Sequence, residues 1–371
     1  MRTLTVGIDG RAFSSPAAGV RRYVSALVPA LKAADPGLEL VALGGDRDAV
    51  PADVAYVNEP WHLPSNLGWS AMGLPRAAAR ATVDVIHAPA YTAPLWSRAP
   101  VVLTIHDVSY ERHPEWYPYQ RDALRRMFYR RSARTAARVL TDSEFSAGEI
   151  AAAYQIPRER ITVAPLGVSD HFAPSERPGE TLPAGITSPF LLHVGDLHER
   201  RNLGIVVDAL LDLKARGRLY PVSLVLAGVD RGLGDRLRAR LRDDASDLVV
   251  CLDDVTDAQL VTLYRKATAL VYPSRYEGFG LPVLEAMACG TPVIASSAAS
   301  IPEVLGDAGI LVDPDDVSGW ANAIDAILER IELREQMRAA GLTRAKAFTW
   351  ARTASITLDA YRQVAAGSRR P

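Results

Sequence analysis

The sequence predicts an α/β fold with parallel, doubly wound sheets, divided between two domains. Short apolar runs that end in polar residues recur along the 371-residue chain. Segments with the apolar spacing of amphipathic helices separate these runs. The alternation stops once, near the middle of the chain, and then restarts. A chain of this length also favours two domains over one.

In the first half, residues 3–8 form the first expected strand, and an amphipathic helix over about Val20–Ala33 follows the loop SSPAAG. Later runs repeat the pattern of a buried strand with a polar end: LELVAL, VDVIHA, PVVLTIHD, RVLTDS and RITVAPLGV. In a parallel sheet these polar ends collect at one edge, where ligands bind. We therefore expect a binding edge that includes His106 and Asp107.

Between His171 and Ser188 the chain is rich in proline and glycine and has little periodicity. Such composition is typical of a linker. We therefore expect a first domain over residues 1–172, a linker over 173–188 and a second domain over 189–349. Helical spacing resumes at the end of the chain, and we expect the C-terminal helix 350–371 to join the first domain.

The composition is ordinary for a soluble enzyme, with 48% hydrophobic and 23% charged residues and a net charge of -1. This balance gives no global attraction to nucleic acid. No apolar run approaches the ~18 residues that cross a membrane. Cys251 and Cys289 lie far apart in apolar segments, which favours buried free thiols in a reducing compartment. We expect a cytoplasmic protein.

The most informative stretch is Tyr272–Ser296, YPSRYEGFGLPVLEAMACGTPVIAS. It predicts the end of a strand, a glycine loop, a helix and another buried strand. The first N–H groups of a helix lack partners and attract anions. The loop has no lysine and instead carries Glu277, with Glu285 in the helix. Carboxylates beside a phosphate site suit hydroxyls, so the stretch predicts a ligand whose phosphates are flanked by sugars.

HVGDLHERRNLG, residues 193–204, places Arg200 and Arg201 after a strand, ahead of a helix that Asn202 is able to cap. Guanidinium groups grip a diphosphate with paired hydrogen bonds. The alternative is a solvated charge pair, because Glu199 is adjacent. For His106 two readings stay open: a donor to a sugar hydroxyl or phosphate, or a structural histidine satisfied by its neighbour.

Several classes of site are disfavoured. Gly195-Asp196-Leu197 follows a strand but lacks the remaining glycines of a dinucleotide fingerprint, and no P-loop pattern occurs. No HExxH motif or clustered Cys/His spacing indicates zinc. The D-x-D pairs at 46–48 and 313–315 are typical of turns, so we expect no metal site.

Residues 121–138, from Arg121 to Arg138, contain seven arginines and one aspartate, with Leu124, Phe128 and Tyr129 interleaved. A basic helix of this kind is able to lie on an anionic lipid surface. The alternative is an arginine-rich solvated helix. Under the first reading the protein contacts the inner face of the cell membrane peripherally.

The chain resembles retaining glycosyltransferases of family 4, the glycosyl transferases group 1. Their E-x7-E motif matches Glu277 to Glu285. Further segments follow the family pattern in order: GIDGRAF, AGVRRYV, TIHDVSY, LTDSEFS, APLGVSDHF, HVGDLHERRNL and SIPEVLGDAGILVDP. The resemblance covers about residues 6–361 and implies the GT-B architecture, two facing Rossmann-like domains with an interdomain cleft.

The resemblance also implies roles for single residues. Glu285 is expected to hold the ribose hydroxyls, and Glu277 to contact the donor sugar near its reacting carbon. The backbone N–H groups expected to bind the donor diphosphate belong to Gly278, Phe279, Gly280 and Leu281.

For the remaining positions, the resemblance implies that Arg201, in place of the usual lysine, neutralises the leaving diphosphate beside Arg200. His106 is expected to face the donor sugar, and Gly19 to lie in a loop that closes over the diphosphate. Arg21 departs from the family's early G-x-G-R-Y loop by replacing its second glycine. Leu166 departs from the usual N-G-V-D by replacing its asparagine.

The expected activity is metal-independent transfer of a hexose, mannose-type, from a nucleotide-diphosphate sugar to a glycan or lipid-linked acceptor in cell-surface polysaccharide synthesis. GDP-mannose or a UDP-sugar is the expected co-substrate, with no further cofactor. The alternative is a GT-B protein that binds sugar nucleotides without transferring them, such as a partner subunit or an epimerase-like relative.

Overall fold

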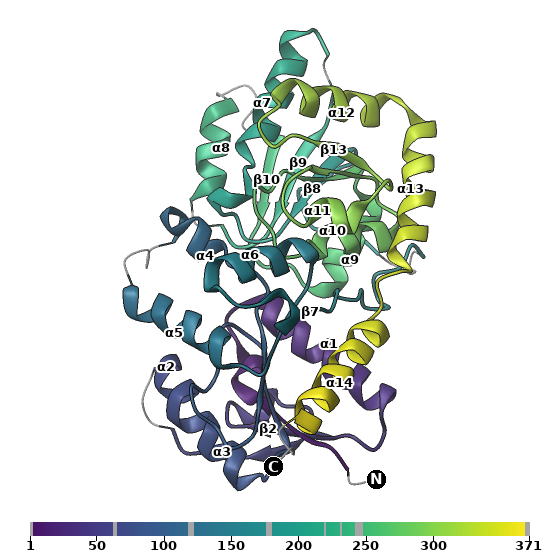
Figure 1. Cartoon of the computed structure of the whole chain (residues 1–371). Helices are drawn as coiled ribbons and strands as arrows, with labels where there is room; N and C mark the ends of the chain where they lie inside the picture. The colour runs from purple at the N-terminus through teal and green to yellow at the C-terminus, as the bar shows by residue number, and fades with distance from the viewer. Residues whose placement is uncertain are drawn as a thin grey trace. The chain divides into compact units, whose positions relative to one another are not determined.

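The computed structural model describes residues 3–61, 65–117, 122–175, 180–218, 220–230, 232–241 and 248–367. The chain forms two compact units (Figure 1). Unit 1 comprises Met1–Gly167 with Thr349–Pro371, and unit 2 comprises Val168–Phe348.

The linker expected over 173–188 is not a free connection in its described parts, because it packs within unit 2. Arg265 Nε donates to the carbonyl oxygen of Ala173 at 2.6 Å, and its Nη1 contacts Glu180. The Arg265 side chain is 3% exposed. Residues 176–179 of the expected linker lie outside the described residues. The chain instead passes between the units at 167–168 and 348–349.

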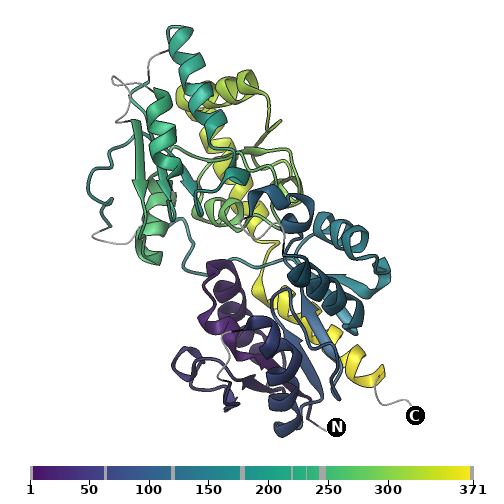
Figure 2. The same ribbon diagram turned by 90° about the vertical axis from the view of Figure 1, so that its left-hand side faces the viewer.

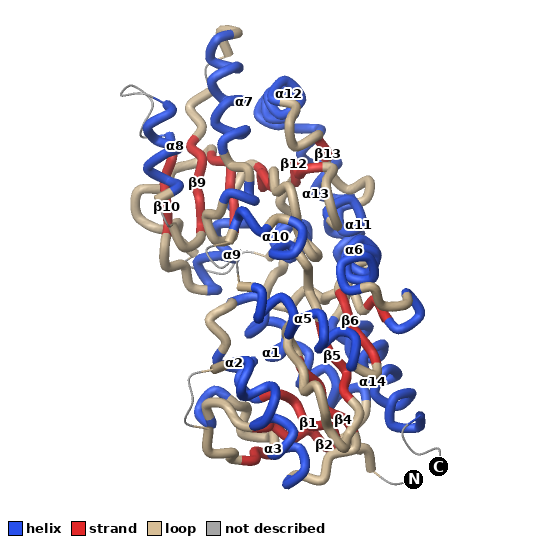
Figure 3. The backbone as a smooth tube through the Cα atoms, turned by 60° about the vertical axis from the view of Figure 1, so that its left-hand side comes forward, coloured by secondary structure: helices blue, strands red, loops and turns tan. Residues whose placement is uncertain are grey.

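Unit 1 contains one seven-stranded sheet of order β3-β2-β1-β4-β5-β6-β7, and every pairing in it is parallel. Figure 3 shows these strands among helices. The strands are β1 Thr5–Asp9, β2 Glu39–Leu43, β3 Ala55–Val57, β4 Val85–Ala88, β5 Val101–Thr104, β6 Arg138–Thr141 and β7 Ile161–Val163. Their buried side chains are the apolar runs that predicted them, apart from β3, which is too short to give a pattern.

The helices of unit 1 cover this sheet, and the C-terminal helix α14 packs along α1 (Figure 2). The α-helices are α1 Ala18–Ala34, α2 Asn66–Gly68, α3 Leu74–Arg80, α4 Ser109–Arg112, α5 Ala123–Thr135, α6 Glu144–Tyr154 and α14 Trp350–Gly367. Short turns are η1 Gly10–Ser14, η2 Arg47–Ala49, η3 Trp69–Gly73, η4 Pro114–Trp116 and η5 Arg158–Arg160. A C-terminal helix therefore belongs to the unit formed by the N-terminal part of the chain.

Unit 2 contains a six-stranded parallel sheet of order β10-β9-β8-β11-β12-β13. Helix α7 packs against α12, and α10 packs against α9, α11 and α13. The strands are β8 Phe190–Val194, β9 Ser223–Ala227, β10 Val249–Leu252, β11 Ala269–Tyr272, β12 Val293–Ser296 and β13 Ile310–Val312. The helices are η6 Glu199–Arg201, α7 Gly204–Ala215, α8 Leu233–Leu241, α9 Asp257–Lys266, α10 Leu281–Cys289, α11 Ile301–Leu305, α12 Val317–Glu329 and α13 Ile331–Ala345.

The strand order reverses beside the first strand of each sheet, between β1 and β4 in unit 1 and between β8 and β11 in unit 2. In doubly wound sheets, ligands bind beyond the carboxyl ends of the strands at this switch point. In unit 2 the register pairs Leu270 with Leu192. The loops that follow β8 and β11 therefore start side by side, which brings the arginines after residue 195 to the Glu277 loop.

Cys251 and Cys289 are free, with Cys289 buried and Cys251 half-buried. Among the described residues, no helix is long and apolar enough to cross a membrane.

Candidate functional site

The loop after β11 is buried except at Arg275, and hydrogen bonds fix its backbone. Ser300 Oγ lies 2.9 Å from the carbonyl oxygens of both Glu277 and Phe279 and so fixes two points of the loop backbone. Gly280 adopts φ +111, a left-handed backbone that suits glycine, and α10 begins at the next residue. Pro282 lies in the first turn of α10, as the sequence predicts. The loop thus presents a fixed helix start at the switch point.

Arg201 and Glu277, which are 76 positions apart, form an ion pair beside this loop. Arg201 is 8% exposed and Glu277 6% exposed. The Nη1 atom of Arg201 also donates to Tyr272 Oη at 2.5 Å and to Ser274 Oγ at 3.5 Å. Burial lowers the pKa of the Arg201 guanidinium from its ordinary value, and the phenol of Tyr272 opposes this shift. The structure therefore brings together two of the residues expected in the donor site.

The loop after β8 orients these residues through its backbone. Arg275 N donates to the carbonyl oxygen of Arg200 at 2.9 Å, which joins the two loops. Glu199 pairs with Arg236 at 2.8 Å, whereas Arg201 pairs with Glu277. The solvated charge pair of Glu199 with Arg201 that the sequence allowed therefore does not form. The prediction that Asn202 caps α7 through its side chain is wrong. Its Nδ2 donates to the carbonyl oxygen of Pro314 at 2.7 Å instead.

Glu285 lies one turn inside α10 and is 1% exposed. One of its carboxylate oxygens accepts a hydrogen bond of 2.8 Å from Tyr264 Oη. Thr291 Oγ1 in turn donates to the carbonyl oxygen of Tyr264 at 2.6 Å. A buried carboxylate held by a phenol has a defined direction, which suits recognition of hydroxyl groups.

In unit 1, His106 follows β5 and is held through both ring nitrogens. Nδ1 lies 2.8 Å from Asp142 Oδ2, and Nε2 lies 3.2 Å from the carbonyl oxygen of Pro89. A carboxylate and a carbonyl oxygen are both acceptors, an arrangement that favours a proton on each ring nitrogen, and burial also raises the pKa of Asp142. Burial works to lower the pKa of His106, but the charges and hydrogen bonds of its neighbours, Asp142 foremost, outweigh burial and raise the pKa.

A buried hydrogen-bond chain supports the ring of His106, and the sequence did not indicate it. Tyr23 packs edge-on against His106, with ring centroids 4.9 Å apart, and its hydroxyl lies 3.2 Å from Thr104 Oγ1. Thr104 Oγ1 lies 2.8 Å from His87 Nε2, and His87 Nδ1 lies 2.7 Å from Tyr361 Oη on α14. Burial lowers the pKa of His87 to about 3, so this ring is neutral.

Comparison with known proteins identifies the family. The family model of glycosyl transferases group 1 matches residues 188–330, and that of glycosyltransferase family 4 matches residues 17–172. The O-antigen chain mannosyltransferase B of Escherichia coli is 37% identical over 270 residues, which cover 70% of this chain and 70% of that relative. The chain belongs to glycosyltransferase family 4.

Other relatives of this glycosyltransferase agree with that placement. The D-inositol 3-phosphate glycosyltransferase of Paenarthrobacter aurescens is 33% identical over 62% of this chain, and the match spans 59% of that relative. The sucrose-phosphate synthase of Thermosynechococcus elongatus superposes with a TM-score of 0.77 at 23% identity, covering 99% of this chain and 100% of the other. The two Rossmann-like units therefore form a GT-B fold.

In this glycosyltransferase Gly19, which the family resemblance implies for a closing loop, lies in the first turn of α1. It is the second residue of α1, is exposed, and would have no atom within 4 Å of an added Cβ. The expected closing loop therefore ends before Gly19, because the helix begins two residues earlier than its apolar pattern indicates. Helix ends commonly differ from predictions by this amount.

The basic segment, residues 121–138, forms α5 and the first residue of β6 in its described part. Most of its arginines contact other residues of unit 1. Arg126 pairs with Glu111, and Arg134 Nε donates to the carbonyl oxygen of Tyr154 at 2.8 Å. Arg121 lies outside the described residues. Exposed members of α5 that have no recorded partner among the described residues are Arg130 and Arg131, together with the apolar Leu124 and Met127, which are 62% and 45% exposed.

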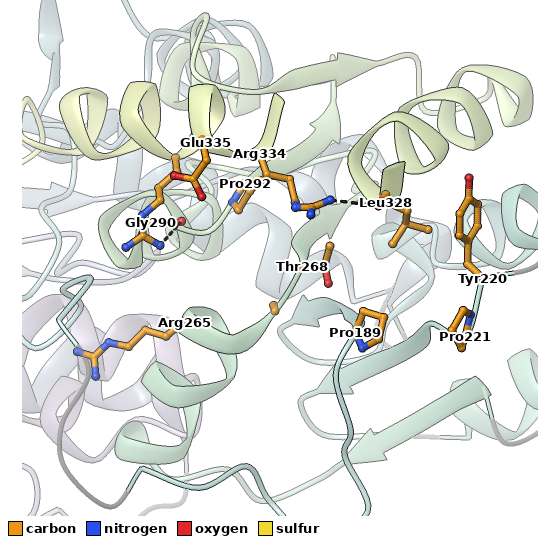
Figure 4. Close-up of a pocket in the computed structure, with 12 residues that line it drawn as sticks. Pro189, Tyr220, Pro221, Arg265, Thr268, Gly290, Pro292, Leu328, Arg334 and Glu335 are labelled. Carbon is orange, nitrogen blue, oxygen red and sulfur yellow. Dashed lines mark hydrogen bonds between the residues drawn. The ribbon is translucent and has the colours of Figure 1, made fainter. Parts of the chain in front are cut away.

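A groove of about 480 Å³ lies at the opposite, amino edge of the unit 2 sheet (Figure 4). Arg334 Nη1 donates to the carbonyl oxygens of Ile327 at 2.5 Å and Leu328 at 3.1 Å, near the end of α12. Arg338 Nη1 lies 3.5 Å from the carbonyl oxygen of Gly290, after α10. These arginines satisfy helix ends, so their charges have a structural explanation. Lining residues that directly precede β8, β11 and β12 are Pro189, Thr268 and Pro292.

Among the residues that the structure describes, no group of three or more His, Cys, Asp or Glu side chains is placed to hold a metal ion.

Proposed function

We propose that this glycosyltransferase moves a mannose-type hexose from a nucleoside-diphosphate sugar to a glycan or lipid-linked acceptor, with retention of the anomeric configuration. The similarity to an O-antigen chain mannosyltransferase supports the sugar and the acceptor class. The proposal extends to cell-surface polysaccharide synthesis on the cytoplasmic side of the membrane, with no cofactor besides the sugar nucleotide.

The observation that carries this proposal is the buried pair of Arg201 and Glu277 at the switch point of unit 2. A guanidinium at this edge suits the diphosphate of a donor, and the adjoining carboxylate suits sugar hydroxyls. Glu285, held in the following helix by Tyr264, supports recognition of the ribose. The loop after β11, the helix α10 and the neighbouring loop after β8 thus carry groups that suit both the phosphates and the sugars of a donor.

The proposed chemistry uses positive charge to stabilise the leaving group. As the bond between the sugar and the diphosphate breaks, Arg201 and Arg200 neutralise the charge that develops on the diphosphate oxygens. The acceptor hydroxyl attacks from the face that the diphosphate leaves and passes its proton to the departing phosphate oxygen. Glu277 orients the sugar. Because guanidinium groups supply the positive charge, we propose that transfer needs no metal ion.

The test is transfer from a panel of donors that includes GDP-mannose and UDP-glucose to a lipid-linked oligosaccharide, followed by mass spectrometry. We expect GDP-mannose to be used and EDTA to leave the rate unchanged. NMR of the product should show the anomeric configuration of the donor. Binding of a donor without any transfer would support the alternative of a sugar-nucleotide-binding protein. No binding of any donor would overturn the proposal.

We also propose peripheral contact with anionic lipid through α5. Arg130 and Arg131 are exposed together with Leu124 and Met127, and basic side chains beside apolar ones suit the surface of an anionic bilayer. An Arg130→Ala/Arg131→Ala variant should lose flotation with phosphatidylglycerol vesicles at low salt. Arg76→Ala/Arg98→Ala, which removes two other exposed arginines of unit 1, serves as the control. Equal flotation of the wild type and the α5 variant would contradict the proposal.

A further inference from the structure

The guanidinium of Arg201 is anchored on one side and free on the other. Its Nη1 atom is occupied by Glu277, Tyr272 and Ser274. Its Nε atom is buried and has no hydrogen-bond partner among the described residues, and none is recorded there for Nη2. The Nε and Nη2 atoms form the edge through which arginine binds two oxygens of one anion at once. A buried donor without a partner is costly, which indicates that a ligand completes this edge.

Gly195 lies against this free edge. An ideal Cβ at Gly195 would lie 3.0 Å from Nη2, 3.4 Å from Cζ and 3.6 Å from Nε of Arg201. The backbone of Gly195 is fixed, because its N–H donates to the carbonyl oxygen of Ala227 at 2.9 Å. A methyl group at this position would therefore occupy space beside the two free N–H groups.

We propose that Gly195 is a positioning residue that keeps the Nε–Nη2 edge of Arg201 open for two oxygens of one phosphate group of the donor. The inference deepens the proposed function and rests on it. It also accounts for an arginine where the family usually has lysine. Arginine holds Glu277 through Nη1 and still offers two parallel N–H groups, whereas a lysine ammonium is a single point charge.

Gly195 also has a backbone reason to be glycine, because its φ is +125. A comparison with Gly217 separates the effect of the positive φ from the effect of crowding Arg201. Gly217 has φ +76, and an added Cβ there would have no atom within 4 Å. Alanine at either position strains the backbone. Only alanine at Gly195 crowds a guanidinium.

The test compares Gly195→Ala, Gly217→Ala and Arg201→Lys with the wild type by calorimetric titration of GDP, UDP and the matching nucleosides. We expect Gly195→Ala to bind the preferred nucleoside diphosphate about tenfold more weakly, a loss equivalent to part of one charge-assisted bidentate contact. Nucleoside affinity should not change. Both glycine variants should melt at a lower temperature than the wild type, because both strain the backbone. Gly217→Ala should nevertheless keep wild-type affinity for the diphosphate.

Wild-type diphosphate affinity in Gly195→Ala would overturn this inference alone. If Gly195→Ala does not fold, Arg201→Lys decides: it keeps the charge and loses the two-pronged edge, so we expect weaker binding of the diphosphate and unchanged nucleoside affinity. Wild-type affinity in Arg201→Lys would overturn the inference. Absence of diphosphate binding in the wild type would overturn the proposed function together with it.

Discussion

Each unit places a basic side chain against a carboxyl group at the carboxyl edge of its sheet, and the two pairs differ in what they leave free. In unit 1, His106 contacts Asp142 through Nδ1 and the carbonyl oxygen of Pro89 through Nε2. In unit 2, Arg201 pairs with Glu277 but has a buried Nε atom without a partner among the described residues. The first pair is closed by protein groups, and the second is open to a ligand.

This difference separates two kinds of function that look alike in the sequence, where both residues follow a strand. The ring of His106 is held in one orientation, because both of its nitrogens already have hydrogen-bond partners. An open guanidinium can gain hydrogen bonds when an anion arrives. We therefore expect changes at the unit 2 pair to act on catalysis first, and changes at the unit 1 pair to act on stability first.

The largest expected effect is that of Glu277→Gln, which removes the carboxylate charge but keeps the size of the side chain. We expect kcat to fall about 10²–10³-fold, the range typical of a lost electrostatic contact to the reacting group. Steady-state transfer assays measure the effect. Glu335→Gln, an exposed change in the same unit, should retain the wild-type rate. A fully active Glu277→Gln protein would show that the open pair takes no part in catalysis.

His106→Gln tests the closed pair. It removes a charged hydrogen bond to buried Asp142, and we expect the free energy of unfolding to fall by about 2–3 kcal/mol. The pKa of His106 is raised in the folded protein. The stabilisation that His106 gives the folded protein is therefore complete at a pH below the ordinary histidine pKa of about 6.5. It is lost as the pH rises through the folded-state pKa of His106.

Urea unfolding between pH 5 and pH 9 measures this contribution. The wild type should lose stability toward the upper end of that range, and His106→Gln should lose less. A pH dependence that is the same in both proteins would indicate that His106 does not gain a proton through its contact with Asp142 in the folded protein.

Much of the fold could be predicted because its signals are local. Buried strands of parallel sheets are apolar runs, and the turn at Gly280 needs a left-handed residue that glycine supplies. The glutamates of E-x7-E lie within one segment, so the sequence also indicated the place of Glu277 and Glu285. The family models and relatives confirm the glycosyltransferase assignment that this segment suggested.

The pairings within the sites could not be predicted, because they depend on which strands are neighbours. Arg201 meets Glu277 only because β8 lies beside β11. His87 meets Tyr361 across 274 positions through the packing of the C-terminal helix on unit 1. Residue spacing does not encode such neighbours. The start of α1 differs from the expected one by two residues for another reason: a helix start is only weakly marked when alanine and glycine precede the apolar face.

The smallest expected effect is that of Tyr361→Phe, which tests how far the closed character of the unit 1 site extends. The change removes the 2.7 Å hydrogen bond to His87 Nδ1 and leaves a buried nitrogen unpaired, so we expect a loss of about 1 kcal/mol. Tyr56→Phe, which removes a more exposed hydrogen bond to Gly45 in the same unit, is the control and should cost less. Because Tyr361 acts on His106 only through His87, Thr104 and Tyr23, kcat and the donor KM should stay at wild-type values while the melting temperature falls. A fall in kcat with unchanged stability would instead mean that the hydrogen-bond chain orients His106 for the reaction, and the unit 1 pair would then belong with Arg201 and Glu277 among the groups that act during transfer.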